Sequence, residues 1–325
     1  MSKIKRVGVL TSGGDAPGMN AAIRAVTRAA IVNKMEVFGI KMGYEGMING
    51  DIEQLHSQDV SGIIQKGGTI LKTARSAHFR TPEGRRLAFD NLKKFDIDGI
   101  VVIGGDGSFT GASILSQEYD IPVIGIPGTI DNDLFGTDYT IGYDTCLNTV
   151  IEAVDKIRDT ASSHNRIFFV EVMGRDAGFV ALEGGIATGA EVIMIPEVKN
   201  QMLELRDFLS RRAKLNKSSI IIVAEGDDEG NAYEIAKKVE PEFPQFDIRV
   251  TILGHIQRGG SPTCYDRVSA SRMGVAAIEA LIDDQKSIMI GLSHGQIVHV
   301  PLNKTVKTHK GVPKGLLDVA HILAI

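Results

Sequence analysis

Short runs of branched apolar residues recur along the chain and alternate with longer stretches in which apolar side chains return every three or four positions. Two runs, residues 99–103 and 220–223, are apolar almost throughout, which indicates strands buried on both faces, as in a parallel sheet covered by helices. The other runs of this kind are residues 7–10, 37–40, 123–126, 167–172, 192–195 and 249–253. We expect each run to form a strand.

Helical spacing is clearest between Leu147 and Arg158, where apolar side chains at positions 147, 150, 151, 154 and 157 fall on one helical face. Similar amphipathic stretches follow Met19, Gly84, Ala177, Met202 and Asp266. Strands that alternate with helices in this way are typical of βαβ units. The pattern predicts an α/β fold with mostly parallel sheets.

The length and composition indicate a folded protein with more than one lobe. The chain has 325 residues, against roughly 100 to 200 for a typical domain. Apolar residues make up 43% and charged residues 23%, which is an ordinary globular composition. The net charge of -4 provides no general positive field, so we expect neither nucleic acid nor a membrane as a partner. Any anion site has to be local.

The first residues and the cysteines indicate the cellular compartment in which the protein is expected. Polar Thr11 and Ser12 follow an apolar run that is too short for a signal-peptide core, and no apolar run approaches the length of a membrane helix. We therefore expect a cytoplasmic protein. Cys146 and Cys264 lack the spacing of a disulfide framework or a thiolate zinc site, and we expect both to be structural thiols.

Two glycine-rich loops follow predicted strands. Residues 11–18 join the first strand to a helical stretch, and residues 104–108 follow the buried run at 99–103. Backbone N–H groups at such strand–turn–helix corners bind phosphate, and an acid such as Asp106 binds Mg²⁺. Neither loop has the G-x-G-x-x-G pattern of a dinucleotide site or the G-x-x-x-x-G-K-[ST] pattern of a P-loop. Each loop alone is also explained as a simple turn, with Asp106 capping a helix.

A third loop, residues 127–133, follows another predicted strand and carries Asp131 and Asp133. In an extended chain the two carboxylates point to the same side, which suggests divided roles: one accepts a proton from an attacking hydroxyl and the other orders magnesium. An Asn- and Asp-rich loop is also common turn chemistry. The basic cluster from Lys72 to Arg86 suits phosphate, although an exposed basic face would explain it equally well.

Together these segments resemble the bacterial ATP-dependent 6-phosphofructokinases, from Val7 to Arg267. The motifs that carry the resemblance occur in the family's order and are LTSGGDAPGMNAAIR (10–24), GGDGS (104–108), PGTIDNDLFGTDYTIG (127–142), EVMGRDAG (171–178) and LGHIQRGGSP (253–262). The resemblance implies a homotetramer whose subunit has two Rossmann-like three-layer lobes with the active site in the cleft between them. The larger, ATP-binding lobe would comprise residues 1–141 and about 256–305, and the smaller, sugar-phosphate-binding lobe residues 142–255 and about 306–325.

The resemblance also implies the residues of the site. MgATP would be bound by Gly14, Tyr44, Arg75, Ser76, Gly105, Asp106, Gly107 and Ser108. Fructose 6-phosphate would be bound by Thr129, Ile130, Asp131, Arg166, Met173, Gly174, Arg175, Glu225, Arg249, His255, Ile256, Gln257 and Arg258. Within these sets Asp106 would hold the metal with Asp133 close to it, and Asp131 would be the catalytic base. Arg75 and Arg175 would offset charge on the transferred group. Arg166 and Arg249 would reach in from a neighbouring subunit.

Two glycines bear on the phosphoryl donor. Relatives that use pyrophosphate resemble this pattern but carry Asp in place of Gly107 and Lys in place of Gly128. Because both positions are glycine here, the resemblance favours ATP as the donor.

The family also has an effector pocket, which takes ADP or GDP as activator and phosphoenolpyruvate as inhibitor. Its residues would be Arg24, Arg28, Arg158, Gly189, Glu191, Lys214 and Lys217. Ser57, Gly62 and Asn216 stand where well-regulated members have arginine, an acid and lysine. The loss of two cations predicts weak or altered regulation, because each charge-assisted hydrogen bond contributes about 1.5 to 3 kcal/mol.

Two other interpretations remain open. A kinase that acts on NAD or lipids through a GGDG loop would not require the arginines of the HIQRGG and MGRDAG segments. A catalytically silent nucleotide-binding regulator would be expected to have lost Asp131 or Asp106, and both are present.

Overall fold

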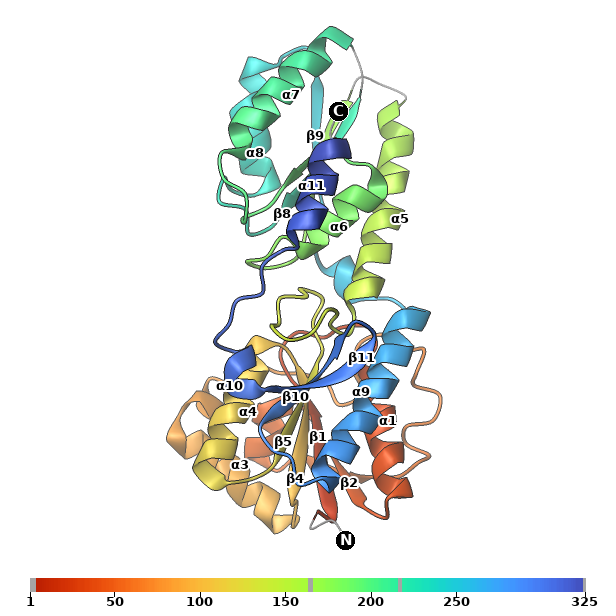
Figure 1. The fold of residues 1–325 in the computed structure, drawn as a ribbon, viewed down its shortest axis with the longest axis vertical. Helices are drawn as coiled ribbons and strands as arrows, with labels where there is room; N and C mark the ends of the chain where they lie inside the picture. The colour runs from red at the N-terminus through yellow and green to blue at the C-terminus, as the bar shows by residue number, and fades with distance from the viewer. Residues whose placement is uncertain (1–3, 163–165, 216–217, 324–325) are drawn as a thin grey trace. The chain divides into compact units, whose positions relative to one another are not determined.

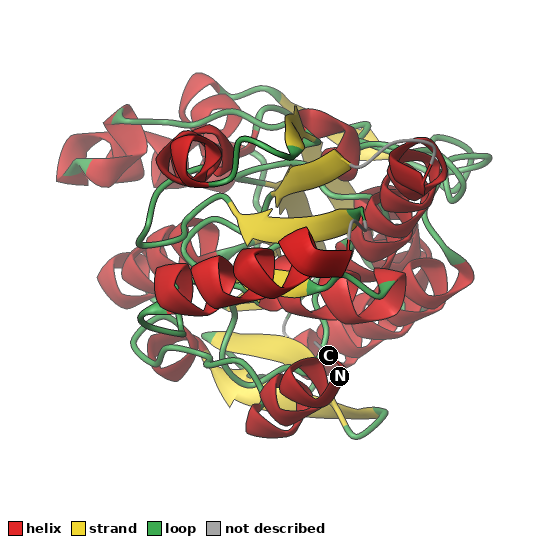
Figure 2. Cartoon of the chain, turned by 90° about the horizontal axis from the view of Figure 1, so that it is seen from above, coloured by secondary structure: helices red, strands yellow, loops and turns green. Residues whose placement is uncertain are grey.

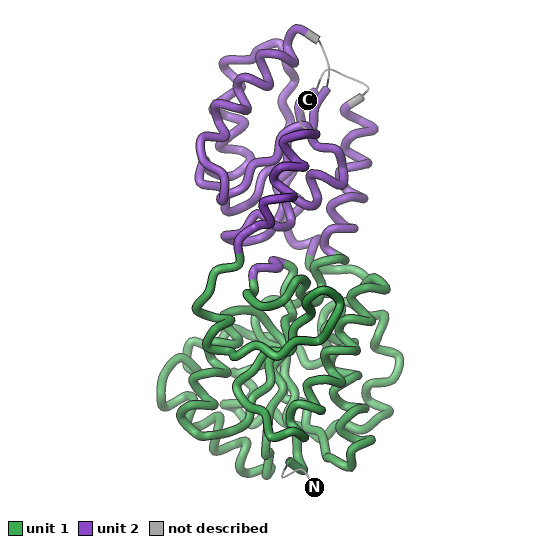
Figure 3. Tube along the Cα trace, in the orientation of Figure 1, with its two compact units in different colours: residues 1–130, 134–145, 258–310 green, residues 131–133, 146–257, 311–325 purple. Residues whose placement is uncertain are grey.

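The computed structural model of the chain describes residues 4–162, 166–215 and 218–323. The chain divides into two compact units, each assembled from separate stretches of sequence (Figure 3). Unit 1 comprises residues 1–130, 134–145 and 258–310, and unit 2 comprises residues 131–133, 146–257 and 311–325. These units differ from the predicted lobes in two ways. Residues 131–133 and 256–257 group with unit 2, and residues 142–145 and 306–310 group with unit 1.

Unit 1 is built on a seven-stranded sheet with the strand order β11-β10-β5-β4-β1-β2-β3 (Figure 1). Its strands are β1 (Arg6–Thr11), β2 (Glu36–Ile40), β3 (Ile52–Leu55), β4 (Gly99–Gly104), β5 (Val123–Pro127), β10 (Ile288–Ser293) and β11 (Gln296–Pro301). The inner strands are parallel, while β3 and β11 pair antiparallel at the two edges. Every residue of β4 and β5 is buried, as the apolar runs in the sequence predict.

Helices cover both faces of this sheet. They are α1 (Met19–Val32), α2 (Gly43–Asn49), α3 (Pro82–Lys94), α4 (Asp106–Tyr119), α9 (Cys264–Ile282) and α10 (Leu302–Thr305), with a 3₁₀ turn η1 at His78–Arg80. α1 and α9 lie side by side on one face, and α3 and α4 lie on the other (Figure 1). The core under α3 and α4 includes Leu92, Val102 and Phe109.

Unit 2 is built on a smaller, fully parallel sheet with the order β7-β8-β6-β9. Its strands are β6 (Arg166–Val172), β7 (Val192–Met194), β8 (Ser219–Ala224) and β9 (Asp247–Ile252). The other elements, drawn by type in Figure 2, are α5 (Tyr143–Ser162), α6 (Phe179–Thr188), α7 (Gln201–Leu215), α8 (Ala232–Val239), α11 (Lys314–Leu323) and the 3₁₀ turns η2 (Glu240–Glu242) and η3 (Gly254–Arg258). The first turn of α5 and the last residue of η3 belong to unit 1. An apolar core that includes Phe169, Leu205 and Ile235 packs this unit.

The predicted strands and helices are present, and the α/β class is confirmed. The hydrophobic pattern missed β3, β10 and β11. β3 has only 4 residues, and β10 and β11 form an antiparallel hairpin. That hairpin turns through His294 and Gly295, with left-handed φ values of 50° and 75°. A hairpin lacks the strand–helix alternation that identified the other strands.

Two further features concern the described residues. None of their helices combines the length and apolar character needed to cross a membrane. Cys146 is buried and Cys264 is exposed, and neither belongs to a disulfide.

Candidate active site

Three loops of unit 1 leave the same edge of its sheet. β4 pairs with β1 on one side and with β5 on the other, and the register places Thr11 opposite Ile103 and Gly104 opposite Pro127. The loops that follow β1, β4 and β5 therefore begin next to one another at the carboxyl edge. The order of the strands reverses between β1 and β4. This is the point at which open α/β sheets bind their ligands.

The loops after β1 and β4 interlock at this edge. A Cβ at Gly104 would lie 2.6 Å from Ser108 Oγ and 2.6 Å from the carbonyl oxygen of Ser12, so only glycine fits there. Ser108 is buried, and its N–H donates to the carbonyl of Gly105 at 3.0 Å. Asp106 is the first residue of α4. The first N–H groups of this helix therefore lie beside the glycine loops, an arrangement that binds phosphate.

Arg258 lies against the loop after β1. A Cβ at Gly14 would lie 2.3 Å from Arg258 Nη1, and this nitrogen donates to the carbonyl oxygen of Asp15 at 3.4 Å. A guanidinium next to a glycine loop favours an anion there. Arg258, predicted for fructose 6-phosphate, and Gly14, predicted for MgATP, are thus neighbours within unit 1.

Tyr44 takes part in the packing of α4. Its hydroxyl donates to the carbonyl oxygen of Ser108 at 2.5 Å, and its ring stacks on Phe79 with the centroids 3.9 Å apart. Burial raises the pKa of Tyr44, so the phenol stays protonated and acts as a donor. Ser76 Oγ accepts from the N–H of Phe79 at 3.1 Å, while Arg75 is exposed. Contact of Tyr44, Arg75 and Ser76 with a nucleotide stays a prediction.

Residues 128–142 form the loop that carries the predicted base. The N–H of Ile141 donates to the carbonyl of Pro127 at 2.8 Å, and the hydroxyl of Thr140 donates to the carbonyl of Thr129 at 2.6 Å. These bonds join the two ends of the loop at the sheet edge. The loop is therefore closed at its base.

Asp131 lies in this loop, in the stretch 131–133 that groups with unit 2. It is 8% exposed, Ile130 beside it is fully buried, and Asn132 has a left-handed φ of 53°. The expectation that Asp131 and Asp133 point to one side of an extended chain is wrong, because the left-handed residue between them breaks the extended alternation. Asp133 is less buried than Asp131. The two carboxylates have different surroundings, which agrees with different roles.

Asp106 is the metal ligand that the sequence predicts. Among the residues that the structure describes, no group of three or more His, Cys, Asp or Glu side chains is placed to hold a metal ion. Mg²⁺ is commonly held by one or two carboxylates together with phosphate oxygens and water. A carboxylate at the start of α4, beside the glycine loops, fits a metal that arrives with a nucleotide.

A second set of predicted residues lies at the carboxyl edge of the unit 2 sheet. Met173 follows β6 directly, and Glu225 follows β8, with its N–H donating to the carbonyl of Val172 at 3.0 Å. Glu225 Oε1 accepts from the N–H of Arg175 at 2.8 Å. Arg175, which comes after Gly174, has a left-handed φ of 56° and an exposed side chain. Strained backbone of this kind occurs at ligand sites, and Glu225 holds it in place.

The predicted ligand residues in the turn η3 differ in exposure. His255 and Ile256 are exposed, whereas Gln257 is fully buried. Gln257 Oε1 accepts from the N–H of Met173 at 3.2 Å, and its amide nitrogen donates to the carbonyl of Gly254 at 3.0 Å. The side chain of Gln257 is therefore used inside unit 2 to position Met173. Direct ligand contact by this side chain stays a prediction that its burial disfavours.

Arg166 and Arg249 lie toward the opposite edge of the same sheet. Arg166 is the first residue of β6, and its Nε lies 2.8 Å from Asp247 Oδ2, while Arg249 Nε lies 2.9 Å from Asp247 Oδ1. The hydrogen bond from Arg166, aided by Arg249, lowers the pKa of Asp247. β6 rises about 20 Å between Arg166 and Met173. One copy of unit 2 therefore cannot present both residues to the same small ligand.

Comparison with known proteins decides the family. Residues 6–281 match the family described as Phosphofructokinase. This chain belongs to the phosphofructokinase family. It is 60% identical to the ATP-dependent 6-phosphofructokinase 2 of Bacteroides thetaiotaomicron, over 100% of both chains. It is 53% identical to the ATP-dependent 6-phosphofructokinase 1 of Thermus thermophilus, over 99% of this chain and 100% of that protein.

Solved phosphofructokinases share the fold. The phosphofructokinase of Saccharomyces cerevisiae matches with a TM-score of 0.89 and 40% identity, covering 99% of this chain and 48% of that chain. The present chain thus spans about half of the yeast chain. The pyrophosphate-dependent phosphofructokinase of Marinobacter aquaeolei matches with a TM-score of 0.85 at 22% identity, over 99% and 92% of the two chains. At that identity the likeness is one of fold.

In this phosphofructokinase the predicted effector residues fall in both units. Arg24 and Arg28 lie one turn apart on α1 of unit 1, and both are partly exposed. Lys214 is exposed in the last turn of α7 in unit 2. Lys217, and the departure at Asn216, lie outside the described residues.

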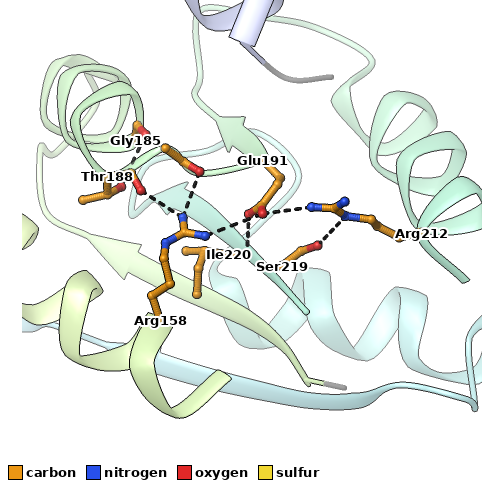
Figure 4. A network of polar contacts seen from close by, with 8 residues as sticks. Arg158, Gly185, Thr188, Glu191, Arg212, Ser219 and Ile220 are labelled. Atoms are coloured by element: carbon orange, nitrogen blue, oxygen red, sulfur yellow. Dashed lines mark hydrogen bonds and ion pairs between the residues drawn. The ribbon is translucent and has the colours of Figure 1, made fainter. Parts of the chain in front are cut away.

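The other effector residues form one polar network in unit 2 (Figure 4). Arg158 Nη2 donates to the carbonyls of Thr188 and Gly189 at 2.9 and 2.8 Å, at the carboxyl end of α6, where a cation is favourable. Arg158 Nη1 lies 3.6 Å from Glu191 Oε1, and Arg212 Nη2 lies 2.9 Å from the same oxygen. Sequence reasoning missed Arg212, whose only signal was its place among basic residues near the end of a helix.

Proposed function

We propose that this phosphofructokinase transfers the γ-phosphoryl group of ATP to O1 of fructose 6-phosphate, giving fructose 1,6-bisphosphate and ADP in the committed step of glycolysis. The observation that carries the proposal is the 60% identity, along the whole chain, to a protein named ATP-dependent 6-phosphofructokinase 2. The glycine loops at the β1–β4 edge support it, because they would supply a phosphate site. We assign the reaction to the cytoplasm, where glycolysis takes place.

Unit 1 would bind MgATP. The backbone at Gly14, Gly105 and Gly107 and the hydroxyl of Ser108 would contact the phosphates, because the glycine loops lie beside the start of α4. Asp106 would hold Mg²⁺ together with phosphate oxygens, and Asp133 is the second carboxylate assigned to its surroundings. When bound, the metal offsets negative charge on the phosphates.

Asp131 acts as the general base in this proposal. Its carboxylate accepts the proton of the O1 hydroxyl while O1 bonds to the γ-phosphorus and the bond from that phosphorus to the bridging oxygen of ADP breaks. General-base catalysis of this kind contributes about 10² to 10⁴ in rate. The exposed guanidinium groups of Arg75 and Arg175 would neutralise charge on the transferred group and on ADP.

Fructose 6-phosphate would be bound by residues at the carboxyl edge of the unit 2 sheet, with Thr129 and Arg258 of unit 1. The unit 2 residues in this group are Met173, Gly174, Arg175, Glu225 and His255. Arg166 and Arg249 would serve the site of a neighbouring subunit in a homotetramer. The length of β6 supports this division, because the two ends of one strand cannot reach one sugar phosphate.

We also propose that regulation by ADP, GDP or phosphoenolpyruvate is weak in this chain. Ser57 removes one cation of the family's effector pocket. Glu191 and Arg158 are in addition already engaged with partners of their own unit.

A coupled assay tests the reaction. The purified chain is offered fructose 6-phosphate and Mg²⁺ with either ATP or pyrophosphate, and Asp131→Asn is the matched variant. Activity with ATP alone, lowered at least about 100-fold in Asp131→Asn, would support the kinase and its base together. Activity with pyrophosphate would contradict the choice of donor. If neither donor works, a different acceptor or a silent nucleotide-binding regulator becomes the better explanation.

A further inference from the structure

A fully enclosed carboxylate lies at the start of α9. Asp266 is 1% exposed and is the third residue of that helix, whose first turn is capped by Thr263 Oγ1 accepting from the N–H of Asp266 at 3.2 Å. The Asp266 side chain does not cap its own helix. Its Oδ1 accepts from the N–H of Gly142 at 2.7 Å, and its Oδ2 accepts from the N–H of Thr145 at 2.8 Å and from the Thr145 hydroxyl at 2.5 Å.

The groups that Asp266 binds occupy one junction of the chain. Gly142 ends the loop that carries Asp131, and Thr145 lies in the first turn of α5. A carboxylate at a helix N-terminus is favoured by the helix dipole and by the unpaired N–H groups there. Asp266 therefore fixes the end of the loop and the start of the helix with the same two oxygens.

In a second pair of hydrogen bonds, Thr263 at the start of α9 donates to residues in the first turn of α5. The N–H of Thr263 donates to Thr145 Oγ1 at 3.0 Å, and the hydroxyl of Thr263 donates to Asp144 Oδ2 at 2.6 Å. The N-termini of α5 and α9 thus each donate hydrogen bonds to the other. Asp266 also reaches the backbone of the Asp131 loop, through the N–H of Gly142.

The junction is packed without spare room. Gly142 has a left-handed φ of 99°, and a Cβ there would lie 2.7 Å from the Cβ of Ala16, in the glycine loop after β1. A Cβ at Gly18, at the end of that glycine loop, would lie 2.7 Å from Ile141 Cγ2 and 3.5 Å from the Cβ of Asp266. A shift of the Asp266 side chain would therefore be transmitted to both loops.

The two ends of the Asp131 loop are hydrogen-bonded to each other, which leaves the loop little freedom to absorb such a shift. Ile141 is bonded to Pro127 of β5, and the Thr140 hydroxyl is bonded to the carbonyl of Thr129, two residues before Asp131. Displacing Gly142 would strain these bonds and move the backbone that carries the base.

We infer that Asp266 is a positioning residue for phosphoryl transfer: by holding Gly142 and the first turn of α5, its carboxylate sets the place of Asp131. This inference rests on the proposed function. Burial raises the pKa of Asp266, and the hydrogen bonds from Thr145 and Gly142 oppose the rise. All three groups bonded to the Asp266 oxygens are donors, which suits the acceptor oxygens of a carboxylate. An amide at this position would set its NH₂ group against an N–H donor.

The test compares Asp266→Asn with Asp144→Asn in the full-length chain. Asp144 belongs to the same junction, where its carboxylate accepts from the hydroxyl of Thr263 at 2.6 Å. We expect Asp266→Asn to lower kcat at least about tenfold with the KM for ATP nearly unchanged, because small displacements of catalytic groups are costly. Asp144→Asn should keep kcat within about twofold of the unaltered protein.

A double-mutant cycle separates positioning from general stability. In the Asp131→Asn background the base is absent, so Asp266→Asn should change the residual rate by less than about twofold. An equal loss in both backgrounds would overturn the inference, as would a kcat for Asp266→Asn equal to that of the unaltered protein. If Asp266→Asn fails to fold, Thr145→Val removes one of the same bonds and should show a smaller loss with the same dependence on Asp131. Thr145→Val with unaltered kcat would overturn the inference in that case. An unaltered protein inactive on fructose 6-phosphate would overturn the proposed function first.

Discussion

Arg212 and Glu191 form an ion pair with 2.9 Å between Nη2 and Oε1, and each side chain is only 16% exposed (Figure 4). The second oxygen of Glu191 accepts from the N–H of Ile220 at 2.8 Å, and Arg212 Nε donates to Ser219 Oγ at 2.9 Å. The pair therefore joins the end of α7 to β8 and to the residue before β7. A carboxylate that the family resemblance assigns to effector binding is already neutralised within its own unit.

We expect Arg212→Ala to lower the free energy of unfolding by about 1 to 3 kcal/mol, because Glu191 would stay largely buried and lose its nearest cation. Urea unfolding at pH 7 measures this loss. Arg211→Ala is the matched control, since Arg211 neighbours Arg212 on α7 but is exposed, and exposed charges contribute little. Equal losses in the two variants would contradict the prediction.

Restoring a lost cation should strengthen regulation. Ser57 is exposed, and the family resemblance assigns arginine to this position in well-regulated members. We expect Ser57→Arg to lower the phosphoenolpyruvate concentration for half-inhibition by about tenfold, because one charge-assisted hydrogen bond contributes about 1.5 to 3 kcal/mol. Gly62 is a poorer choice, because its left-handed φ of 65° suits glycine and would strain an acidic residue.

Steady-state kinetics with phosphoenolpyruvate check the Ser57→Arg prediction. Ser57→Gln adds length without charge and should leave inhibition as it is in the unaltered protein. A matching change in Ser57→Gln, or no change in Ser57→Arg, would count against a charge deficit as the cause of weak regulation.

The ion pair between Arg85 and Glu118 predicts a loss of stability in acid. Arg85 Nε and Nη2 donate to the two oxygens of Glu118, both at 2.7 Å, and the Arg85 side chain is 8% exposed. The hydrogen bond from Arg85 lowers the pKa of Glu118. A carboxylate whose pKa is lowered by folding adds stability above its unfolded pKa of about 4.3, and this stability is lost as the pH falls through the folded value.

We therefore expect Glu118→Gln to cost about 1 to 3 kcal/mol of unfolding free energy at pH 7, and the difference from the unaltered protein to shrink as the pH falls below about 4. Unfolding curves in urea at several pH values measure it. Glu152→Gln is the control, because Glu152 pairs with Lys156 in an exposed position. A difference for Glu118→Gln that stays constant down to pH 3 would exclude the ion pair as its source.

The sequence predicted the elements that come from repeated local patterns. The apolar runs at residues 99–103 and 220–223 form β4 and β8. A short apolar run bounded by turns is typical of a buried strand in an α/β protein. The position of the glycine-rich segments was also predictable, because a loop that follows a parallel strand leaves the sheet at its carboxyl edge.

The parts that the sequence did not reveal depend on side-chain direction and on contacts between distant segments. Nothing in the order of residues shows that Gln257 points inward to Met173 while His255 and Ile256 point outward. Arg212 and Glu191 are brought together by the packing of α7 on the sheet, which periodicity does not encode. The left-handed residue Asn132, which overturned the extended-chain argument for the two aspartates, is likewise a property of one local turn.

The choice of donor can be tested at Gly107. A Cβ built there meets no atom within 4 Å, so a side chain at this position would project into open space and leave the fold intact. The family resemblance assigns Asp to the matching position in relatives that use pyrophosphate, and a carboxylate beside the phosphate loop would repel the phosphates of ATP. Two like charges about 4 Å apart at a protein surface repel by several kcal/mol. We expect Gly107→Asp to lower kcat/KM for ATP at least about 100-fold while the melting temperature stays within about 2 °C.

Gly107→Asn separates charge from size in this test, because its side chain has nearly the same shape as that of Asp and carries no charge. We expect Gly107→Asn to lose much less activity with ATP than Gly107→Asp, and the ratio of the two losses to fall as salt screens the repulsion. Kinetics with ATP at low and high ionic strength measure this ratio. If the two variants lose activity equally at every ionic strength, then space and not charge makes glycine necessary at this position, and the donor argument has to rest on Gly128 alone.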